Sequence, residues 1–183
     1  MEFDRGITTY DIMPIPPIEA QMQRFDIGPV TVGVEYRLLD EAISAAHTAA
    51  EGYSRDMENA DLSDRGVSLH VFGRSAGEEY EYLRFDCFDE DPHYHYVSYK
   101  NQTNQMVHID PVASGDPLAW ALERIRTRLP QMLTRAGAPE IAAEVDLMAV
   151  EQVLPQVAEV AYRVRFSHDD TAIHAGALAR NAS

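Results

Sequence analysis

The sequence predicts an α+β protein, with a mainly antiparallel sheet of four to five strands in a meander and C-terminal helices packed on one face. Two observations support this fold class. Between residues 66 and 110, segments with strand-like alternation are separated by short stretches rich in turn-forming residues. After residue 116, apolar residues recur at helical spacing instead. Strands followed by helices are typical of a sheet covered by helices on one face.

Residues 1–26 are predicted to form an extended N-terminal arm. Three prolines within it restrict φ and lack N–H donors, and isoleucines between them supply apolar side chains. We therefore expect the arm to lie across the edge of its own sheet or against another chain. The prolines are Pro14, Pro16 and Pro17, and the isoleucines are Ile12, Ile15 and Ile18.

A single α+β domain is expected over residues 27–166. Val30, Val32 and Val34 alternate with other residues, which predicts a half-buried strand. Asp40 is a good N-cap for a helix over roughly 39–52, and a polar loop is expected to follow it. That loop spans 53–65, and the strands after it are expected at about 66–73, 79–88, 93–100 and 104–110.

The last part of the domain is predicted to be helical. Asp116 and Pro117 are an N-cap and a first helical residue, and Gly137 ends the helix that they begin. Pro139 begins a second helix that continues to about Phe166. Residues 167–183 are polar and rich in alanine, so we expect a C-terminal tail there.

Histidines and acids gather on one face of the predicted meander. If DEDP (89–92) and NQTN (101–104) are four-residue loops, Asp86 lies opposite His95, and His95 lies opposite Asp110. His93 and His108 then share this face, and Arg84 stands at its rim. The opposite face carries apolar residues, including Leu83, Phe85, Val107 and Ile109, that would meet the helices.

This polar face is the candidate site. The residues for catalysis are His95, Asp86, Asp110 and Arg84, and the residues for metal binding are His93, His95 and His108. Imidazoles beside carboxylates bind zinc, iron or manganese. The same groups without a metal would serve as a general acid or base, and a solvated outer face of the sheet is the third interpretation.

Composition excludes several classes of function. The net charge of -15 argues against nucleic acid and against anionic membranes as partners. The single cysteine, Cys87, allows no intrachain disulfide, and no run of 18 apolar residues predicts a transmembrane helix. The N-terminus lacks the pattern of a signal peptide, so a cytoplasmic location is expected. Known nucleotide-binding and serine-hydrolase motifs do not occur.

Two functions therefore remain open from the sequence. The first is a small-molecule enzyme of the hydrolase, lyase or isomerase type that uses the histidine and aspartate cluster, with or without a divalent metal. Arg84 would bind a substrate carboxylate in this scheme. The second is a non-catalytic subunit or binding module that docks through its arm and tail. In both cases we expect a homo-oligomer or a subunit of a complex.

Overall fold

The computed structural model describes residues 6–52 and 62–180. Their strands form one antiparallel sheet of seven strands, in the order β1-β7-β6-β5-β4-β3-β2. The expected count of four to five was too low, because strands also form within the N-terminal arm. The strands are β1 (Ile7–Tyr10), β2 (Gln23–Ile27), β3 (Val30–Asp40), β4 (Ser63–Ser75), β5 (Glu78–Phe88), β6 (His93–Ser98) and β7 (Thr103–His108).

The meander runs from β2 to β7, and β1 is its exception. Each strand from β2 onward pairs with the next strand in the sequence, whereas β1 pairs with β7 at the far edge. The expected loop at 53–65 lies outside the described residues except for 62–65, and β4 already begins at Ser63. Residues 11–22 therefore connect the two opposite edges of the sheet.

The helices confirm the α+β class. Asp40, Asp116 and Asp146 are N-caps whose carboxylates accept hydrogen bonds from backbone N–H groups of the first turn. One helix was expected over 139–166, but the structure has two. The backbone is extended at Val145, and a second helix begins after its N-cap, Asp146. The helices are α1 (Glu41–Ala50), α2 (Pro111–Ser114), α3 (Pro117–Arg135), α4 (Pro139–Glu144), α5 (Leu147–Phe166) and α6 (Asp170–Arg180), with one turn of 3₁₀ helix at Glu19–Gln21.

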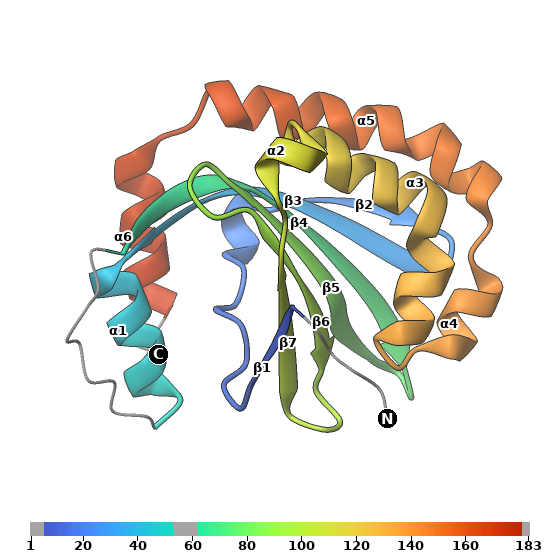
Figure 1. The fold of residues 1–183 in the computed structure, drawn as a ribbon, viewed down its shortest axis with the longest axis horizontal. Helices are drawn as coiled ribbons and strands as arrows, with labels where there is room; N and C mark the ends of the chain where they lie inside the picture. Colours follow the sequence, from blue (N-terminus) through green and yellow to red (C-terminus); the bar gives the residue numbers. More distant parts are fainter. Residues whose placement is uncertain (1–5, 53–61, 181–183) are drawn as a thin grey trace.

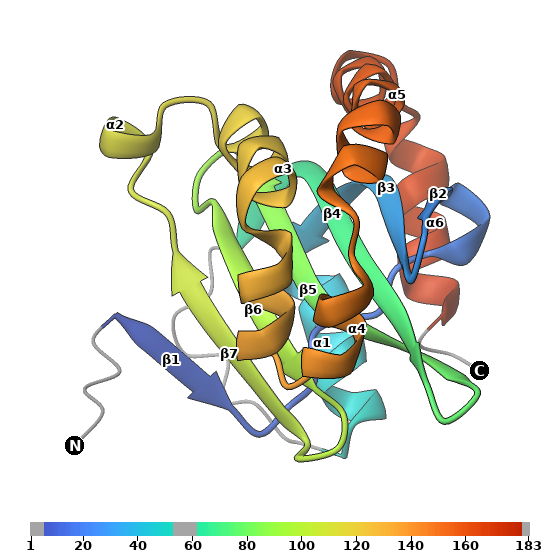
Figure 2. The same ribbon diagram turned by 90° about the vertical axis from the view of Figure 1, so that its right-hand side faces the viewer.

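Helices cover both faces of the curved sheet (Figure 1). Helices α3, α4 and α5 lie over the convex face, and Figure 2 shows α3 and α4 in front of the central strands. Helices α1 and α6 lie on the concave side, beside the connection between β1 and β2. The C-terminal helices expected on one face, α3, α4 and α5, lie there, but the cover of the other face by α1 and α6 was not expected. The segment expected to be a polar tail forms α6, which buries Ile173 and Ala177.

The alternation of side chains sorts the sheet into an apolar and a polar face. Leu83, Phe85 and Cys87 of β5 point into the core beneath the helices and are at most 6% exposed. Ile109 is also buried, and Val107 is partly buried, as the apolar pattern predicted. None of the helices in the described ranges is both long and apolar enough to cross a lipid bilayer. The opposite, concave face carries charged and polar residues that are nevertheless buried.

Residues 11–18, which we name the strap, cover this polar face. The strap contains three prolines, so few of its backbone groups can donate hydrogen bonds. Its carbonyl groups accept from side chains instead. The donors are Asn104 to Ile12, His47 to Met13, Arg37 and Arg84 to Ile15, and Arg180 to Pro16. The side chains of β3, β5, β7, α1 and α6 thus hold the strap in place.

Candidate metal site

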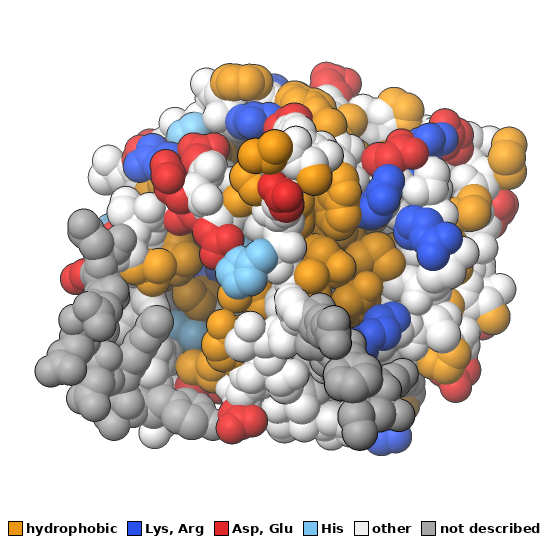
Figure 3. Space-filling view, viewed as in Figure 1, with side chains coloured by type: hydrophobic (Ala, Val, Ile, Leu, Met, Phe, Trp, Pro, Cys, Tyr) orange, Lys and Arg blue, Asp and Glu red, His pale blue; other side chains and the backbone are white. Residues whose placement is uncertain are grey.

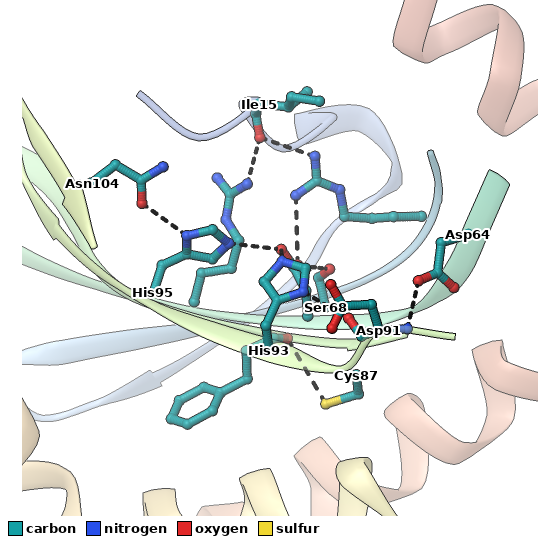
Figure 4. Close-up of polar contacts among 12 residues, drawn as sticks. Ile15, Asp64, Ser68, Cys87, Asp91, His93, His95 and Asn104 are labelled. Carbon is teal, nitrogen blue, oxygen red and sulfur yellow. Dashed lines mark hydrogen bonds and ion pairs between the residues drawn. The ribbon is translucent and has the colours of Figure 1, made fainter. Parts of the chain in front are cut away.

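The candidate site lies where β5 and β6 pass beneath the strap. Asp86 of β5 lies directly opposite His93 of β6, and Arg84 lies opposite His95. His93 and His95 are two residues apart on one strand, so both side chains point to the concave face. Figure 4 shows them on the same side of the sheet as Ile15, with Cys87 on the opposite side.

Two imidazoles converge on one carboxylate. The Nε2 atom of His93 lies 3.3 Å from Oδ2 of Asp86, and Nε2 of His95 lies 3.2 Å from the same oxygen. His93 is 8% exposed, His95 is 5% exposed and Asp86 is 3% exposed. Their ligand atoms all lie within 4.8 Å of one another, the only such group of three or more among the described residues. The two Nε2–Oδ2 distances are close to those between ligands that share one cation at about 2.0–2.2 Å.

Hydrogen bonds on the other side of each ring define its tautomer. Nδ1 of His93 lies 2.7 Å from the carbonyl oxygen of Asp91, which can only accept, so Nδ1 carries the proton. Nδ1 of His95 lies 2.8 Å from Oδ1 of Asn104, whose amide nitrogen donates to the carbonyl of Ile12. In its neutral form each ring would turn the lone pair of Nε2 toward Asp86, and in its protonated form it would donate a hydrogen bond from Nε2 to that carboxylate. Partners of this kind orient histidine ligands in metal sites.

The electrostatics around Asp86 keep a negative charge at the centre. Burial would raise the pKa of Asp86, but hydrogen bonds with His93 and His95 and the charges of Arg37 and Arg84 hold it well below its usual value. Ser68 also donates a hydrogen bond to this carboxylate. Burial lowers the pKa of His95 and so favours its neutral form. Burial also opposes the protonation of His93, but its bond with Asp86 outweighs burial and raises its pKa.

A carboxylate and an imidazole lone pair repel each other at this distance unless a proton or a cation lies between them. Two imidazole nitrogens and one carboxylate oxygen are suitable ligands for zinc, iron or manganese. Three protein ligands leave at least one coordination position open, which distinguishes catalytic from structural metal sites. The same three groups without a metal can pass a proton between His95 and Asp86.

A cavity of about 270 Å³ borders these ligands and gives a small molecule access to them. Its polar lining includes Asp86, His93, His95, Asn104 and Arg37. Figure 3 shows a hollow on this side of the molecule in which histidine lies among hydrophobic side chains. The apolar lining comes from the strap, β3, β5 and β7, and includes Ile12, Met13, Leu38, Phe88 and Met106.

A second buried cluster adjoins the first on β3, β4 and β5. His70 bridges two carboxylates, with Nε2 at 3.0 Å from Glu35 and Nδ1 at 2.6 Å from Glu81. Arg84 binds both oxygens of Glu81 at 2.8 Å and donates to Ile15 at 2.6 Å. Glu35 and Glu81 were not among the predicted site residues. The alternation in TVGVEYR (31–37) and VSLHVF (67–72) places Glu35 and His70 on this face and could have identified them.

The structure brings together only part of the predicted set. Asp86, His93 and His95 meet, but the predicted partners within the sheet were displaced by two residues between β5 and β6 and by four between β6 and β7. His108 consequently lies opposite His93 at the strand end, where it is half-exposed and binds Asp91. Asp110 lies beyond β7 as the N-cap of α2.

Arg84 also differs from its predicted position. It was expected at the rim of the face, free to bind a substrate carboxylate. It is 1% exposed instead, and its guanidinium donates hydrogen bonds to Glu81 and to the carbonyl oxygen of Ile15 in the strap. Arg37 of β3, which the sequence did not single out, lies on the cavity wall.

Comparisons with known proteins identify a family but no described activity. No curated protein and no solved structure matches the chain. One family of proteins matches residues 24–161, which include every residue of both buried clusters and exclude β1, the strap and α6. The chain therefore belongs to the family described as a domain of unknown function, DUF7700.

Proposed function

We propose that this protein is a metal-dependent enzyme that acts on a small molecule in the cavity beneath the strap. The observation that carries the proposal is the convergence of the Nε2 atoms of His93 and His95 on Asp86, with both Nδ1 atoms already hydrogen-bonded to carbonyl oxygens. A divalent cation would occupy the point where the two lone pairs and the carboxylate meet.

Chemistry of the hydrolase, lyase or isomerase type suits such a site. A bound cation polarises a carbonyl group or lowers the pKa of a bound water. The chain itself would supply the ligands, orient them through Asn104 and Asp91, and exclude bulk water with the strap. Zinc, iron and manganese are the metals that these ligands favour.

Metal binding by purified protein tests the proposal. Protein stripped with a chelator should take up one equivalent of Zn²⁺, Fe²⁺ or Mn²⁺, measured by elemental analysis after gel filtration. His95→Ala and Asp86→Asn should each lose the bound metal, because each leaves two of the three ligands and Asp86→Asn also removes the compensating negative charge. Both substitutions should retain a folded circular dichroism spectrum.

His108→Ala is the matched control. It removes a histidine from the same sheet, but one whose side chain is 52% exposed and which stands outside the ligand group. This variant should bind metal as the wild type does. Protein that takes up no metal would contradict the proposal and leave metal-free proton transfer by His95 and Asp86 as the better account. Equal loss in His108→Ala would show that the ligand set is wrong.

Two exposed apolar side chains support a second candidate, a module that docks onto a larger assembly. Val112 on α2 is 93% exposed and Phe166 at the end of α5 is 80% exposed. Exposed apolar residues mark sites of protein association when they form one contiguous patch. In this proposal the chain would form a homo-oligomer or join another subunit in the cytoplasm. Light scattering of the wild type and of Phe166→Ser would test it, with a loss of association expected in the variant.

A further inference from the structure

We infer that the small molecule bound in this cavity is a carboxylate with an apolar body. The inference rests on the proposed metal site and extends it to the class of substrate. Three independent features of the cavity lead to it: the balance of buried charge, the position of Arg37, and the apolar side chains on the remaining walls.

The buried charges around the site nearly cancel before any metal is added. Three carboxylates, of Glu35, Glu81 and Asp86, face the guanidinium groups of Arg37 and Arg84 and the imidazole of His70. A divalent cation would leave one positive charge in excess if His70 is neutral and two if it is protonated. An uncompensated charge in a buried site is costly, so the open coordination position favours an anion.

Arg37 supplies a donor for this anion. Its Nη2 donates to the carbonyl of Ile15 at 2.9 Å, and its Nε lies 3.4 Å from Oε1 of Glu35. Nη1 is buried, and within the described ranges it makes no hydrogen bond, although it lies 3.8 Å from Oδ1 of Asp86. Buried donors of arginine are normally satisfied. An anion bound beside Asp86 would give Nη1 the acceptor it lacks after a small side-chain movement.

The rest of the cavity suits hydrocarbon. Ile12, Met13, Leu38, Phe88 and Met106 contribute apolar surface, and Ser44, His47 and Thr48 of α1 add a few neutral polar groups to the lining. A ligand that is anionic throughout, such as a sugar phosphate, would leave charged groups against this surface. A single carboxylate attached to an aliphatic or aromatic body places its charge and its apolar atoms where each is compensated.

Binding measurements with simple probes test the inference. Metal-loaded protein, its metal content first verified by elemental analysis, would be titrated calorimetrically with phenylacetate, phenylacetamide and acetate. Phenylacetate should bind at least ten times more tightly than phenylacetamide, which has the same shape without the charge. It should also bind more tightly than acetate, which has the charge without the apolar body.

Arg37→Met is the informative variant, and Arg126→Met on the exposed surface of α3 removes the same charge as its control. Arg37→Met should retain the metal and lose most of the preference for phenylacetate over the amide, while Arg126→Met should keep it. If Arg37→Met fails to fold, the comparison of the three probes on wild-type protein still decides. Metal-loaded protein that binds phenylacetate and phenylacetamide equally would overturn the inference alone. Protein that takes up no metal would overturn both the proposed function and this inference.

Discussion

At the scale of single residues, the concave face holds charges that would be unfavourable if any one of them lost its partners. His70 is fully buried, and each of its ring nitrogens faces a carboxylate. Burial would lower its pKa, but the charges and hydrogen bonds of Glu81 and Glu35 outweigh burial and raise it. Where it is protonated, the buried imidazole would therefore stabilise the folded chain.

This pKa shift predicts how the contribution of His70 to stability changes with pH. The folded-state pKa is raised above the unfolded value of 6.5, so the stabilisation is complete below about pH 6.5 and is lost as pH rises through the folded pKa. The difference in unfolding free energy between the wild type and His70→Gln should decrease by about 1.4 kcal/mol per pH unit over that interval. Urea unfolding at several pH values measures it.

His174→Gln is the control for this experiment. His174 also contacts a carboxylate, that of Asp40 at 2.7 Å, but its side chain is 39% exposed. Ion pairs at such positions contribute little, so this variant should differ from the wild type by less than about 1 kcal/mol at every pH. A stability difference for His70→Gln that is independent of pH would show that His70 is not protonated in the folded protein.

Alternation within a strand shows which side chains share a face of the sheet, whatever strand lies beside it. This part of the site could therefore be predicted from the sequence. The predicted pairing was displaced by even numbers of residues, so Asp86, His93 and His95 still share a face. Partners across strands depend on the length of the turns, and there the prediction failed. The last pair between β5 and β6 is Asp86 with His93, so six residues, 87–92, connect them instead of four. The side chain of Asp64 accepts hydrogen bonds from the backbone N–H groups of Glu90 and Asp91 in this connection.

At the scale of elements, the starts of α1 and α3 were predicted well, but the break between α4 and α5, helix α6 and the cover of the polar face were not. Local signals such as Asp40 and Asp116 at N-cap positions act within one turn and are visible in the sequence. The strap and α6 contact residues far away along the chain, such as Arg84 for Ile15 and Gln21 for Ala172. No local pattern specifies such contacts, so the polar face was expected to be open.

Close packing of β4 against β5 predicts a large effect of one substitution. A Cβ atom at Gly66 would overlap the carbonyl oxygen of Cys87 and lie 2.8 Å from Cα of Phe88, so the two strands would have to separate. Gly66→Ala should lower the unfolding free energy by about 2–3 kcal/mol, as overpacking does. Chemical denaturation would measure the loss.

Gly77→Ala in the turn between the same strands is the matched control. Gly77 has a φ of 84°, so alanine there is strained, but nothing lies within 4 Å of the added Cβ. Its expected cost is about 1 kcal/mol. A Gly66→Ala variant no less stable than Gly77→Ala would mean that β4 and β5 approach each other less closely than described.

At the scale of the whole molecule, the sheet separates two layers with different roles. Helices α3, α4 and α5 provide the apolar core on the convex side, with Leu118, Ile125 and Val157 fully buried. The strap, α1 and α6 cover the charged residues on the concave side. The region shared with the family, residues 24–161, contains nearly all of the sheet from β2 to β7 and of the convex layer, but not the strap or α6. Both buried clusters thus lie within the region shared with the family, whereas the strap and α6, which cover them, lie outside it.

The buried contacts of α6 predict that this helix is an integral part of the fold. Ile173 of α6 is 7% exposed and belongs to the hydrophobic core, and Asp170 and His174 pair with Arg65 and Asp40. Ile173→Ala should lower the unfolding free energy by about 2–4 kcal/mol, the usual cost of removing a buried isoleucine side chain. Thr171→Ala, at an exposed position of the same helix, should change it by less than about 0.5 kcal/mol.

Because the strap and the sheet both contact α6, both variants should unfold in one transition, measured by tryptophan fluorescence of Trp120 and by circular dichroism. Equal stabilities of the two variants would show that α6 does not dock, and the concave layer would then consist of the strap and α1 alone.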